Sequence, residues 1–243
     1  QGIGSSTAHL FTSQRDHVTS SFSASTHPSS PKHTARSHSP AGKTTAHVCN
    51  LTDESTVRDT IAWIIDAFGK IHVLAHIAGI YPAHDIAEFP TETYRAVMSV
   101  NVDAAFFLTR AVIPDMRAAG YGRIIHTSSG TIQEPEAGLS VYVASKAVVV
   151  GLVRAVACET GPGITVNAIV PGLIKTERVW GGSVQADGPN PLFESLLRKQ
   201  LVKRWERPED IALAFCFVAS PEAAFLRDRF LNVVGEGDVS VDC

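Results

Sequence analysis

Tyr142-Val143-Ala144-Ser145-Lys146 is the stretch of this 243-residue sequence on which the interpretation of the rest depends. On a helix, the tyrosine and the lysine four residues later lie on one face, one turn apart. An unperturbed phenol has a pKa of about 10, which is too high for easy proton exchange at neutral pH. An ammonium about 4 Å away stabilises the phenolate by about 4 kcal/mol at an effective dielectric constant near 20. The pair therefore predicts a proton-transfer site for an alcohol or a carbonyl group.

Three flanking segments favour this interpretation over the alternative, an ordinary helix with an exposed lysine and a half-buried tyrosine. Ser129 lies thirteen residues before Tyr142 and ends an apolar run that begins at 124. Asn101 lies further upstream in Ser99-Val100-Asn101-Val102, and Pro171-Gly172 follows the apolar run 164–170. The spacing of one tyrosine and one lysine is a weak motif by itself, so these neighbours carry most of the signal.

In their order and spacing, these pieces resemble the short-chain dehydrogenase/reductase family. The resemblance is dense from about residue 47 to 238 and thin before that. It implies a Rossmann-like, doubly wound parallel sheet and an NAD(P)-dependent oxidoreductase that acts on a secondary alcohol or a ketone. The matching motifs are Gly2-Ile3-Gly4, Ala78-Gly79, Asn101, Ser129, Tyr142 with Lys146, Pro171-Gly172 with Thr176, and Pro208-Glu209-Asp210-Ile211-Ala212.

Length and composition suit a single α/β domain over 1–243, with 44% apolar residues and a net charge of −3. This charge gives no reason to expect a nucleic-acid partner. We recognise neither a secretory signal nor an apolar run near the eighteen residues that span a bilayer, so we expect a cytoplasmic protein without a membrane partner. The four cysteines and ten histidines show no metal-ligand spacing, so we expect no metal site.

From residue 43 onward, apolar strands alternate with helices, a pattern typical of a parallel sheet covered on both faces. This is the three-layer α/β/α arrangement that the resemblance also implies. Asp53 or Thr52 can cap one helix and Gly69 can end it. The expected helices are 53–69, 91–99, 102–119, 141–160 and 208–219, and the expected strands are 46–49, 71–77, 123–127, 164–170 and 230–234.

The first 45 residues depart from this pattern. A helix can begin after Gly2-Ile3-Gly4 and a short strand can occupy 18–22, whereas 24–42 is rich in Ser, Thr, His and Pro and predicts a flexible loop. The family's T-G-x-x-x-G-x-G fingerprint follows a first strand, and that strand and the first glycine are both missing. In the family's strand order, 3-2-1-4-5-6-7, we then expect the first two strands of this chain to lack a ladder to the others. We hypothesise a fragment or a misassembled gene model of a longer chain.

The resemblance also implies how a nicotinamide cofactor is held. Gly2, Ile3 and Gly4 would contact its pyrophosphate at a helix start. Asn50-Leu51 stands where the family usually has Asp-Val beside the adenine. Ala78-Gly79 ends the family's N-N-A-G segment, in which His76-Ile77 replaces the two asparagines. The other cofactor-binding candidates are Tyr142, Lys146, Pro171, Gly172, Ile174 and Thr176.

The cofactor is NADP or NAD, and the residues near the expected end of the second strand favour NADP. An acidic residue at that position holds the ribose hydroxyls of NAD. Here no acid occurs between His17 and Thr52, whereas Lys32 and Arg36 do. A cation suits the extra phosphate of NADP.

By resemblance, Tyr142 is the general acid and base, and Lys146 lowers its pKa and holds the nicotinamide ribose. Ser129 hydrogen-bonds the substrate oxygen, although Ser128 is a competing candidate. Asn101 positions a water that relays protons to Lys146; alternatively, it caps or kinks a helix. His126, in the middle of an expected strand, is more typical of a core histidine than of a catalytic one.

Residues 173–205 are expected to form a substrate loop or lid whose Trp180 and Phe193 favour an apolar alcohol or ketone, for example an aromatic one. Alternatively, both aromatics simply pack the loop down. The helices expected at 102–119 and 141–160 pair between subunits in the family, which implies a homodimer or homotetramer. Two other functions stay open: a binding or regulatory protein that has lost catalysis, and a non-redox isomerase or cyclase. Tyr81, Gln133 and Glu134 are further pocket candidates.

Overall fold

The computed structural model describes residues 2–14, 19–24, 44–174, 198 and 200–235. Its strands are all paired in parallel and form two separate sheets. A two-stranded sheet pairs β1 (Thr19–Ala24) with β2 (Thr44–Cys49). The four-stranded sheet has the order β3 (Val73–His76), β4 (Gly122–Thr127), β5 (Ile164–Pro171) and β6 (Phe230–Val233).

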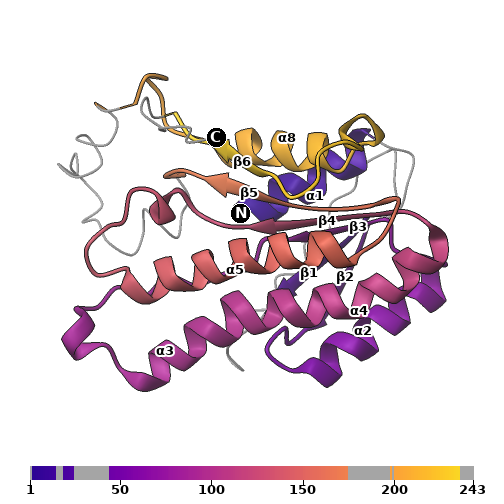
Figure 1. Ribbon diagram of the computed structural model, residues 1–243, viewed down its shortest axis with the longest axis horizontal. Helices are drawn as coiled ribbons and strands as arrows, with labels where there is room; N and C mark the ends of the chain where they lie inside the picture. The colour runs from indigo at the N-terminus through magenta and orange to yellow at the C-terminus, as the bar shows by residue number, and fades with distance from the viewer. Residues whose placement is uncertain (1, 15–18, 25–43, 175–197, 199, 236–243) are drawn as a thin grey trace.

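Helices cover both faces of the four-stranded sheet, which gives the three layers that the alternating pattern predicts (Figure 1). Helices α2, α4 and α5 lie on one face, and α1 and α8 lie on the other. The α-helices are α1 (Ile3–Gln14), α2 (Glu54–Phe68), α3 (Thr91–Met98), α4 (Ala104–Ala119), α5 (Ser140–Glu159) and α8 (Pro208–Val218). The short elements are the 3₁₀ turns η1 (Ile86–Glu88), η3 (Gly130–Ile132) and η4 (Pro221–Ala223) and the π-helical turn η2 (Ser99–Asp103).

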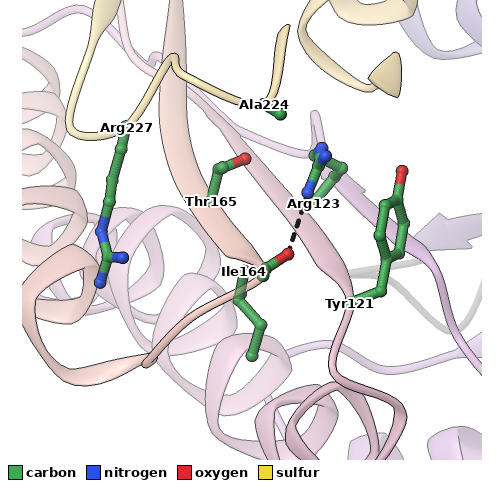
Figure 2. Close-up of a pocket in the computed structure, with 7 residues that line it drawn as sticks. Tyr121, Arg123, Ile164, Thr165, Ala224 and Arg227 are labelled. Atoms are coloured by element: carbon green, nitrogen blue, oxygen red, sulfur yellow. Dashed lines mark hydrogen bonds between the residues drawn. The ribbon is translucent and has the colours of Figure 1, made fainter. Parts of the chain in front are cut away.

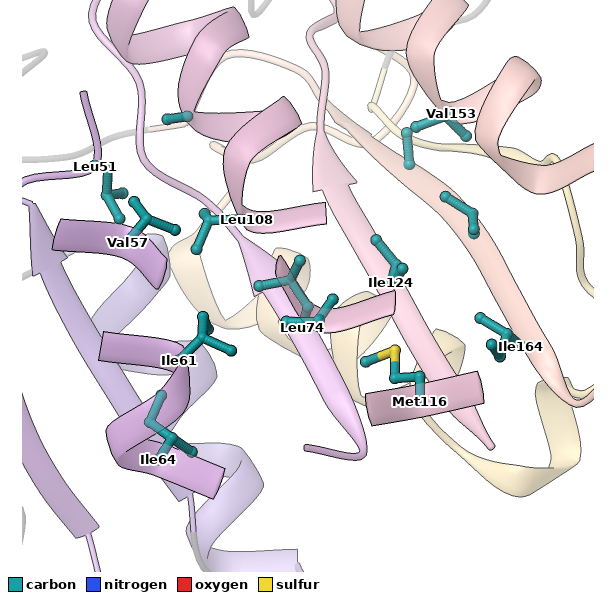
Figure 3. Close-up of a cluster of buried hydrophobic side chains, with 14 of the residues drawn as sticks. Leu51, Val57, Ile61, Ile64, Leu74, Leu108, Met116, Ile124, Val153 and Ile164 are labelled. Carbon is teal, nitrogen blue, oxygen red and sulfur yellow. The ribbon is translucent and has the colours of Figure 1, made fainter. Parts of the chain in front are cut away.

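Two apolar clusters hold these layers together. The larger one joins α2, α4 and α5 to the sheet, and Figure 3 shows Val57, Ile61 and Leu108 facing Leu74 and Ile124 of the strands. The smaller one packs α8 and α1 against the other face. Full burial of one such side chain contributes about 1.5–3 kcal/mol, so these clusters are the main stabilising term of the fold.

The local signals at α2 act as the sequence predicts. Asp53 caps the helix, because its carboxylate accepts hydrogen bonds from the backbone N–H groups of Ser55 and Thr56. Gly69 ends it with a φ of +90°, a backbone conformation that side-chain-bearing residues rarely adopt.

The expected break between helices 91–99 and 102–119 is wrong. One helical segment runs from Thr91 to Ala119, and η2 joins α3 to α4 without interruption. A π-helical turn holds one extra residue per turn and is frequent at functional sites. Here the turn contains Asn101, whose side chain is fully buried. Gly120 then ends α4 in the left-handed conformation, as predicted.

The expected gap in the sheet is confirmed. In the described part of the chain, no strand joins β1 and β2 to β3. The two sheets are held by side-chain packing instead, because Cys49 and Leu51 belong to the same buried cluster as Leu74. Most of the loop expected at 24–42 lies outside the described residues.

Two helices, Thr91–Ala119 and Ser140–Glu159, are long and apolar enough to cross a membrane by length and composition alone. The expectation that no segment approaches this length is therefore wrong. The finding is weak support for a membrane span, because core helices of globular proteins pass the same test. Helix α5 carries the buried Lys146 and packs its apolar face on β5.

Candidate active site

The side chains expected to do chemistry meet where β3 and β4 end. Tyr142 and Lys146 lie on the first turns of α5, Asn101 lies in η2, and Ser129 follows β4. Gly79 lies in the loop after β3. In parallel α/β sheets, ligands bind outside the carboxyl ends of the strands, so the place is typical of a functional site.

Lys146 is buried to 3% exposure, and its ammonium donates a 2.8 Å hydrogen bond to the carbonyl oxygen of Thr127. Burial lowers the pKa of Lys146 to about 8. Its Nζ lies 5.7 Å from the centre of the Tyr142 ring. The neighbouring Ser128 hydroxyl donates to the backbone carbonyl of Lys146 at 3.2 Å, which ties the end of β4 to α5.

The Tyr142 phenol lies beside the Ser129 side chain. Burial raises the pKa of Tyr142, the Ser129 hydroxyl opposes that rise, and the nearby Tyr81 adds to it. The Tyr81 and Tyr142 rings meet edge to face, with centroids 5.9 Å apart. The expectation of a lowered phenol pKa is thus wrong for this structure, because desolvation outweighs the stabilisation of phenolate by a cation.

Ser129, rather than Ser128, is the serine beside the phenol. Its hydroxyl also accepts hydrogen bonds from the Thr131 backbone N–H at 3.3 Å and the Thr131 hydroxyl at 3.0 Å. Ser128 is 1% exposed and is engaged with α5. The thirteen-residue spacing therefore identified the serine that faces Tyr142.

Asn101 ties three segments together. Its side-chain oxygen accepts from the Ile80 backbone N–H at 2.9 Å, and its amide nitrogen donates to the Ile80 carbonyl at 3.0 Å. The same nitrogen donates to the Ser145 hydroxyl at 2.9 Å, and that hydroxyl donates to the Tyr142 carbonyl at 2.7 Å. Both amide hydrogens are therefore used to join the loop after β3 and helix α5 to the π-helical turn.

Gly79 brings the loop after β3 close to this cluster. A Cβ at this position would lie 3.3 Å from both the Asn101 side-chain oxygen and the Lys146 Nζ. That separation is tighter than most real Cβ contacts, so glycine permits the close approach. Ala78, the residue before it, packs against the larger apolar cluster.

A pair of histidines lies beneath the site. The Nδ1 atoms of His76 and His126 are 3.2 Å apart, and His126 Nε2 lies 2.9 Å from the Thr109 hydroxyl. Burial, and then the charge of Lys146, lower the pKa of His126 to about 4. Burial and the charges of His126 and Lys146 lower the pKa of His76 well below its usual value. Both rings are therefore neutral at pH 7, and His126 is a core residue, as expected.

The start of α1 has the properties of a phosphate cradle. The first helical hydrogen bond runs from the Ser6 N–H to the Gly2 carbonyl, so the preceding N–H groups have no helical acceptor. No atom lies within 4 Å of the position that a Cβ would take at Gly2 or Gly4. The space in front of these residues is open, and their contact with a pyrophosphate stays a prediction.

The remaining cofactor candidates have structural partners of their own. The Asn50 side-chain oxygen accepts from the Thr52 hydroxyl and backbone N–H, and Leu51 is buried in the larger apolar cluster. Pro171 ends β5, and the Gly172 N–H donates to the Val233 carbonyl at 3.1 Å. Ile174 is buried and bridges to Glu206. Thr176, Trp180 and Phe193 lie outside the described residues, as does most of the expected lid.

Sequence reasoning missed the residues that hold the site in place. Ser145 connects Asn101 to α5, and it stands between Tyr142 and Lys146 in the sequence. The other groups that position Lys146 and Asn101 are backbone atoms of Thr127 and Ile80. A pattern of side chains in the sequence does not reveal them. Among the residues that the structure describes, no group of three or more His, Cys, Asp or Glu side chains could hold a metal ion.

Comparisons with known proteins show which enzymes this chain is similar to. A family model described as Enoyl-(Acyl carrier protein) reductase matches residues 1–233. Galactitol 2-dehydrogenase (L-tagatose-forming) of Cereibacter sphaeroides is 36% identical over 191 residues, which are 77% of this chain and 73% of that enzyme. D-beta-hydroxybutyrate dehydrogenase of Rhizobium meliloti is 30% identical over 204 residues, 80% of this chain and 78% of that enzyme. The ligand-free structure of Thermoplasma acidophilum aldohexose dehydrogenase superposes with a TM-score of 0.82 at 25% identity, covering 97% of this chain and 89% of that one.

The parallel sheet, its helical layers and these relatives define an oxidoreductase with a Rossmann-type fold. More specifically, the chain belongs to the short-chain dehydrogenase/reductase family, whose dehydrogenases use NAD or NADP.

Proposed function

We propose that this protein interconverts a secondary alcohol and a ketone by hydride transfer to or from a nicotinamide cofactor, with Tyr142 as the general acid and base. The observation that carries the proposal is the position of the Tyr142 phenol. It lies beside Ser129 and on the same helix face as the buried Lys146, at the carboxyl end of β4. A positioned phenol of this kind contributes about 10²- to 10⁴-fold to a proton-transfer step.

The protonation state of Tyr142 favours it as the proton donor in the reducing direction. Its pKa is raised, so the phenol carries its proton at pH 7. The Ser129 hydroxyl can donate a hydrogen bond to the carbonyl oxygen of the substrate, and the Tyr142 O–H transfers its proton to that oxygen as it gains charge. The cofactor, when bound, supplies or accepts the hydride. In the oxidising direction, the phenolate takes the alcohol proton back.

Lys146 and Asn101 act through position and charge. The lysine is held by Thr127 with its ammonium near Gly79, where it can contact a bound ribose and stabilise phenolate after proton transfer. Asn101 fixes the loop after β3 against α5 and so keeps Tyr142 and Lys146 in register. The Asn101 amide hydrogens are used in this network, so a water that relays protons to Lys146 would have to donate to an oxygen of Asn101.

NADP is the proposed cofactor, on the grounds that the segment between His17 and Thr52 carries cations and no acid. An apolar substrate is proposed from the Tyr81 ring, which packs beside the phenol. Relatives named for galactitol and D-beta-hydroxybutyrate oxidise secondary alcohols, which supports the same reaction class here.

A cytoplasmic homodimer or homotetramer is proposed as well, since α4 and α5 each expose an apolar residue, Phe106 and Val148.

The experiment is a titration of the protein with NADPH and with NADH, followed by nicotinamide fluorescence. Aliphatic, alicyclic and aromatic ketones are then added and cofactor oxidation is recorded. We expect binding, tighter for NADPH, and turnover of at least one ketone. Failure of both cofactors to bind would contradict the oxidoreductase function of this chain. Binding without turnover of any ketone would favour a binding or regulatory protein.

A further inference from the structure

A cavity of about 190 Å³, shown in Figure 2, lies at the amino ends of β4 and β5, whereas Tyr142 lies near the carboxyl end of β4. It opens between the first residues of β4 and β5 and the segment that precedes β6, and its lining includes Tyr121, Arg123, Thr165 and Arg227. Four residues of strand separate Arg123 from Thr127, about 13 Å at ~3.3 Å per residue. The cavity is therefore separate from the candidate active site.

Arg123 and Thr165 project into this cavity from adjacent strands. They are register partners in the parallel pair of β4 and β5, so their side chains leave the same face of the sheet. Both are deeply buried, with exposed fractions of 3% and 5%. The cavity wall is thus built on the rigid centre of the sheet and not on a surface loop.

The Arg123 guanidinium is fixed but only partly used. Its Nη1 donates to the carbonyl oxygens of Gly122 at 2.8 Å and Gly163 at 3.1 Å, and the group stacks 4.4 Å from the centre of the Tyr121 ring. Its Nε–H has no hydrogen-bond partner in the described part of the chain, and neither does the Thr165 hydroxyl. Buried polar groups are nearly always paired, so two unpaired donors at one cavity indicate an absent acceptor.

The charge at this cavity is also unbalanced. None of its lining residues carries a carboxylate, and among described residues none lies within ion-pairing distance of Arg123. Arg227 adds a second positive charge, and its guanidinium donates to the carbonyl oxygens of Ala157 and Gly161 at the end of α5. Buried charges are usually paired with an opposite charge, and no described carboxylate does this for Arg123.

We propose that the cavity binds a small oxyanion of the phosphate class, held by the Arg123 guanidinium and the Thr165 hydroxyl. The volume corresponds to about six waters at ~30 Å³ each, enough for a phosphate group with part of its hydration shell. Guanidinium and hydroxyl donors match tetrahedral oxyanions, and the site offers no side-chain carboxylate to repel one. The phosphate can be inorganic or the end of a phosphate monoester.

The test measures phosphate binding to the full chain by ³¹P NMR line width and by thermal unfolding, at constant ionic strength with chloride as the reference anion. We expect saturable binding and a rise in the unfolding temperature that chloride does not produce. Glucose 6-phosphate in a parallel series distinguishes the two sources. Saturation by either phosphate supports the site, and the tighter of the two identifies the source.

Two variants locate the bound anion. Thr165→Val removes one hydroxyl with little change of shape, and Arg123→Lys keeps the charge but loses the Nε–H donor. Each is expected to raise the Kd for phosphate by about tenfold or more. Arg58→Lys, which alters an exposed arginine on α2, is the matched control and should bind as the wild type does. Absence of saturable binding, or binding that Thr165→Val leaves unchanged, would overturn the proposal; the latter would point to the start of α1 instead.

Discussion

The Lys146 ammonium donates a 2.8 Å hydrogen bond to the Thr127 carbonyl, so the last residue of β4 determines where the buried cation lies. This bond is made by the backbone and needs no particular side chain at 127. It joins helix α5 to the sheet at the point where Ser129 and Tyr142 meet. The position of the cation and the position of the phenol are therefore coupled through the end of one strand.

Substitution Lys146→Met should stabilise the protein while abolishing turnover. Burial lowers the pKa of Lys146 from 10.5 to about 8, so holding the charged form in the fold costs stability at pH 7. Removing the buried charge is stabilising and losing the Thr127 hydrogen bond is destabilising. We expect a net gain of about 1–2 kcal/mol in the free energy of unfolding. Urea denaturation at pH 7 measures it. A variant less stable than the wild type would contradict a destabilising buried charge.

The stability gain from Lys146→Met should be smaller at alkaline pH. Above pH 8 the folded wild type releases the Lys146 proton, whereas the unfolded chain keeps its proton up to about pH 10.5. Unfolding then takes up a proton, so wild-type stability rises with pH through this window. When the denaturation is repeated at about pH 10, the free energies of unfolding of the wild type and Lys146→Met should differ less. A constant difference would show that another interaction is responsible.

Acid should destabilise the protein through His126. The folded pKa of about 4 lies below the usual value of 6.5, so the unfolded chain binds the extra proton first. The stability that neutral His126 provides is complete above pH 6.5 and is lost as the pH falls towards 4. We expect His126→Gln to remove about 2 kcal/mol of the stability lost between pH 7 and pH 4.5, as measured by urea denaturation, while the loss due to His76 remains. Equal acid sensitivity in both proteins would exclude this histidine as the cause; His76 and Lys146 are the other titratable groups nearby.

Asn101→Ala should cost more stability than Ser145→Ala. Loss of the Asn101 amide leaves the partly buried N–H and carbonyl of Ile80 without partners, whereas loss of the Ser145 hydroxyl removes one link of the chain. We expect about 2–4 kcal/mol for Asn101→Ala and about 1 kcal/mol for Ser145→Ala. Thermal or urea unfolding of both variants checks the order. Equal costs would mean that the Ile80 contacts contribute little.

Local signals predicted much of this fold from the sequence. The Asp53 cap and Gly69 terminus acted through neighbours within four residues, and so they were readable from the chain alone. The separation of β1 and β2 from the other strands also followed from local observation, because the glycine fingerprint lacked its first glycine and preceding strand. The thirteen-residue spacing likewise selected Ser129 over Ser128 as the partner of Tyr142.

What could not be predicted depends on partners far apart in the sequence. Helix 91–119 runs unbroken through a π turn whose Asn101 bonds Ile80, twenty-one residues away. His76 meets His126 across fifty residues, and its replacement of a family asparagine gave no hint of that pairing. The pKa of Tyr142 went the opposite way from the expectation, since burial depends on the packed tertiary structure and the helix spacing does not report it.

The most direct test compares ketone reduction by the wild type and by Tyr142→Phe, with NADPH binding measured on both. Phenylalanine keeps the ring beside Tyr81 but removes the hydroxyl that lies beside Ser129. We predict a fall in kcat of about 10²- to 10⁴-fold and a nearly unchanged Kd for NADPH. Tyr94→Phe, an exposed tyrosine on α3, should retain wild-type kcat. A Tyr142→Phe enzyme that reduces the ketone at the wild-type rate would contradict the assignment of Tyr142 as the proton donor.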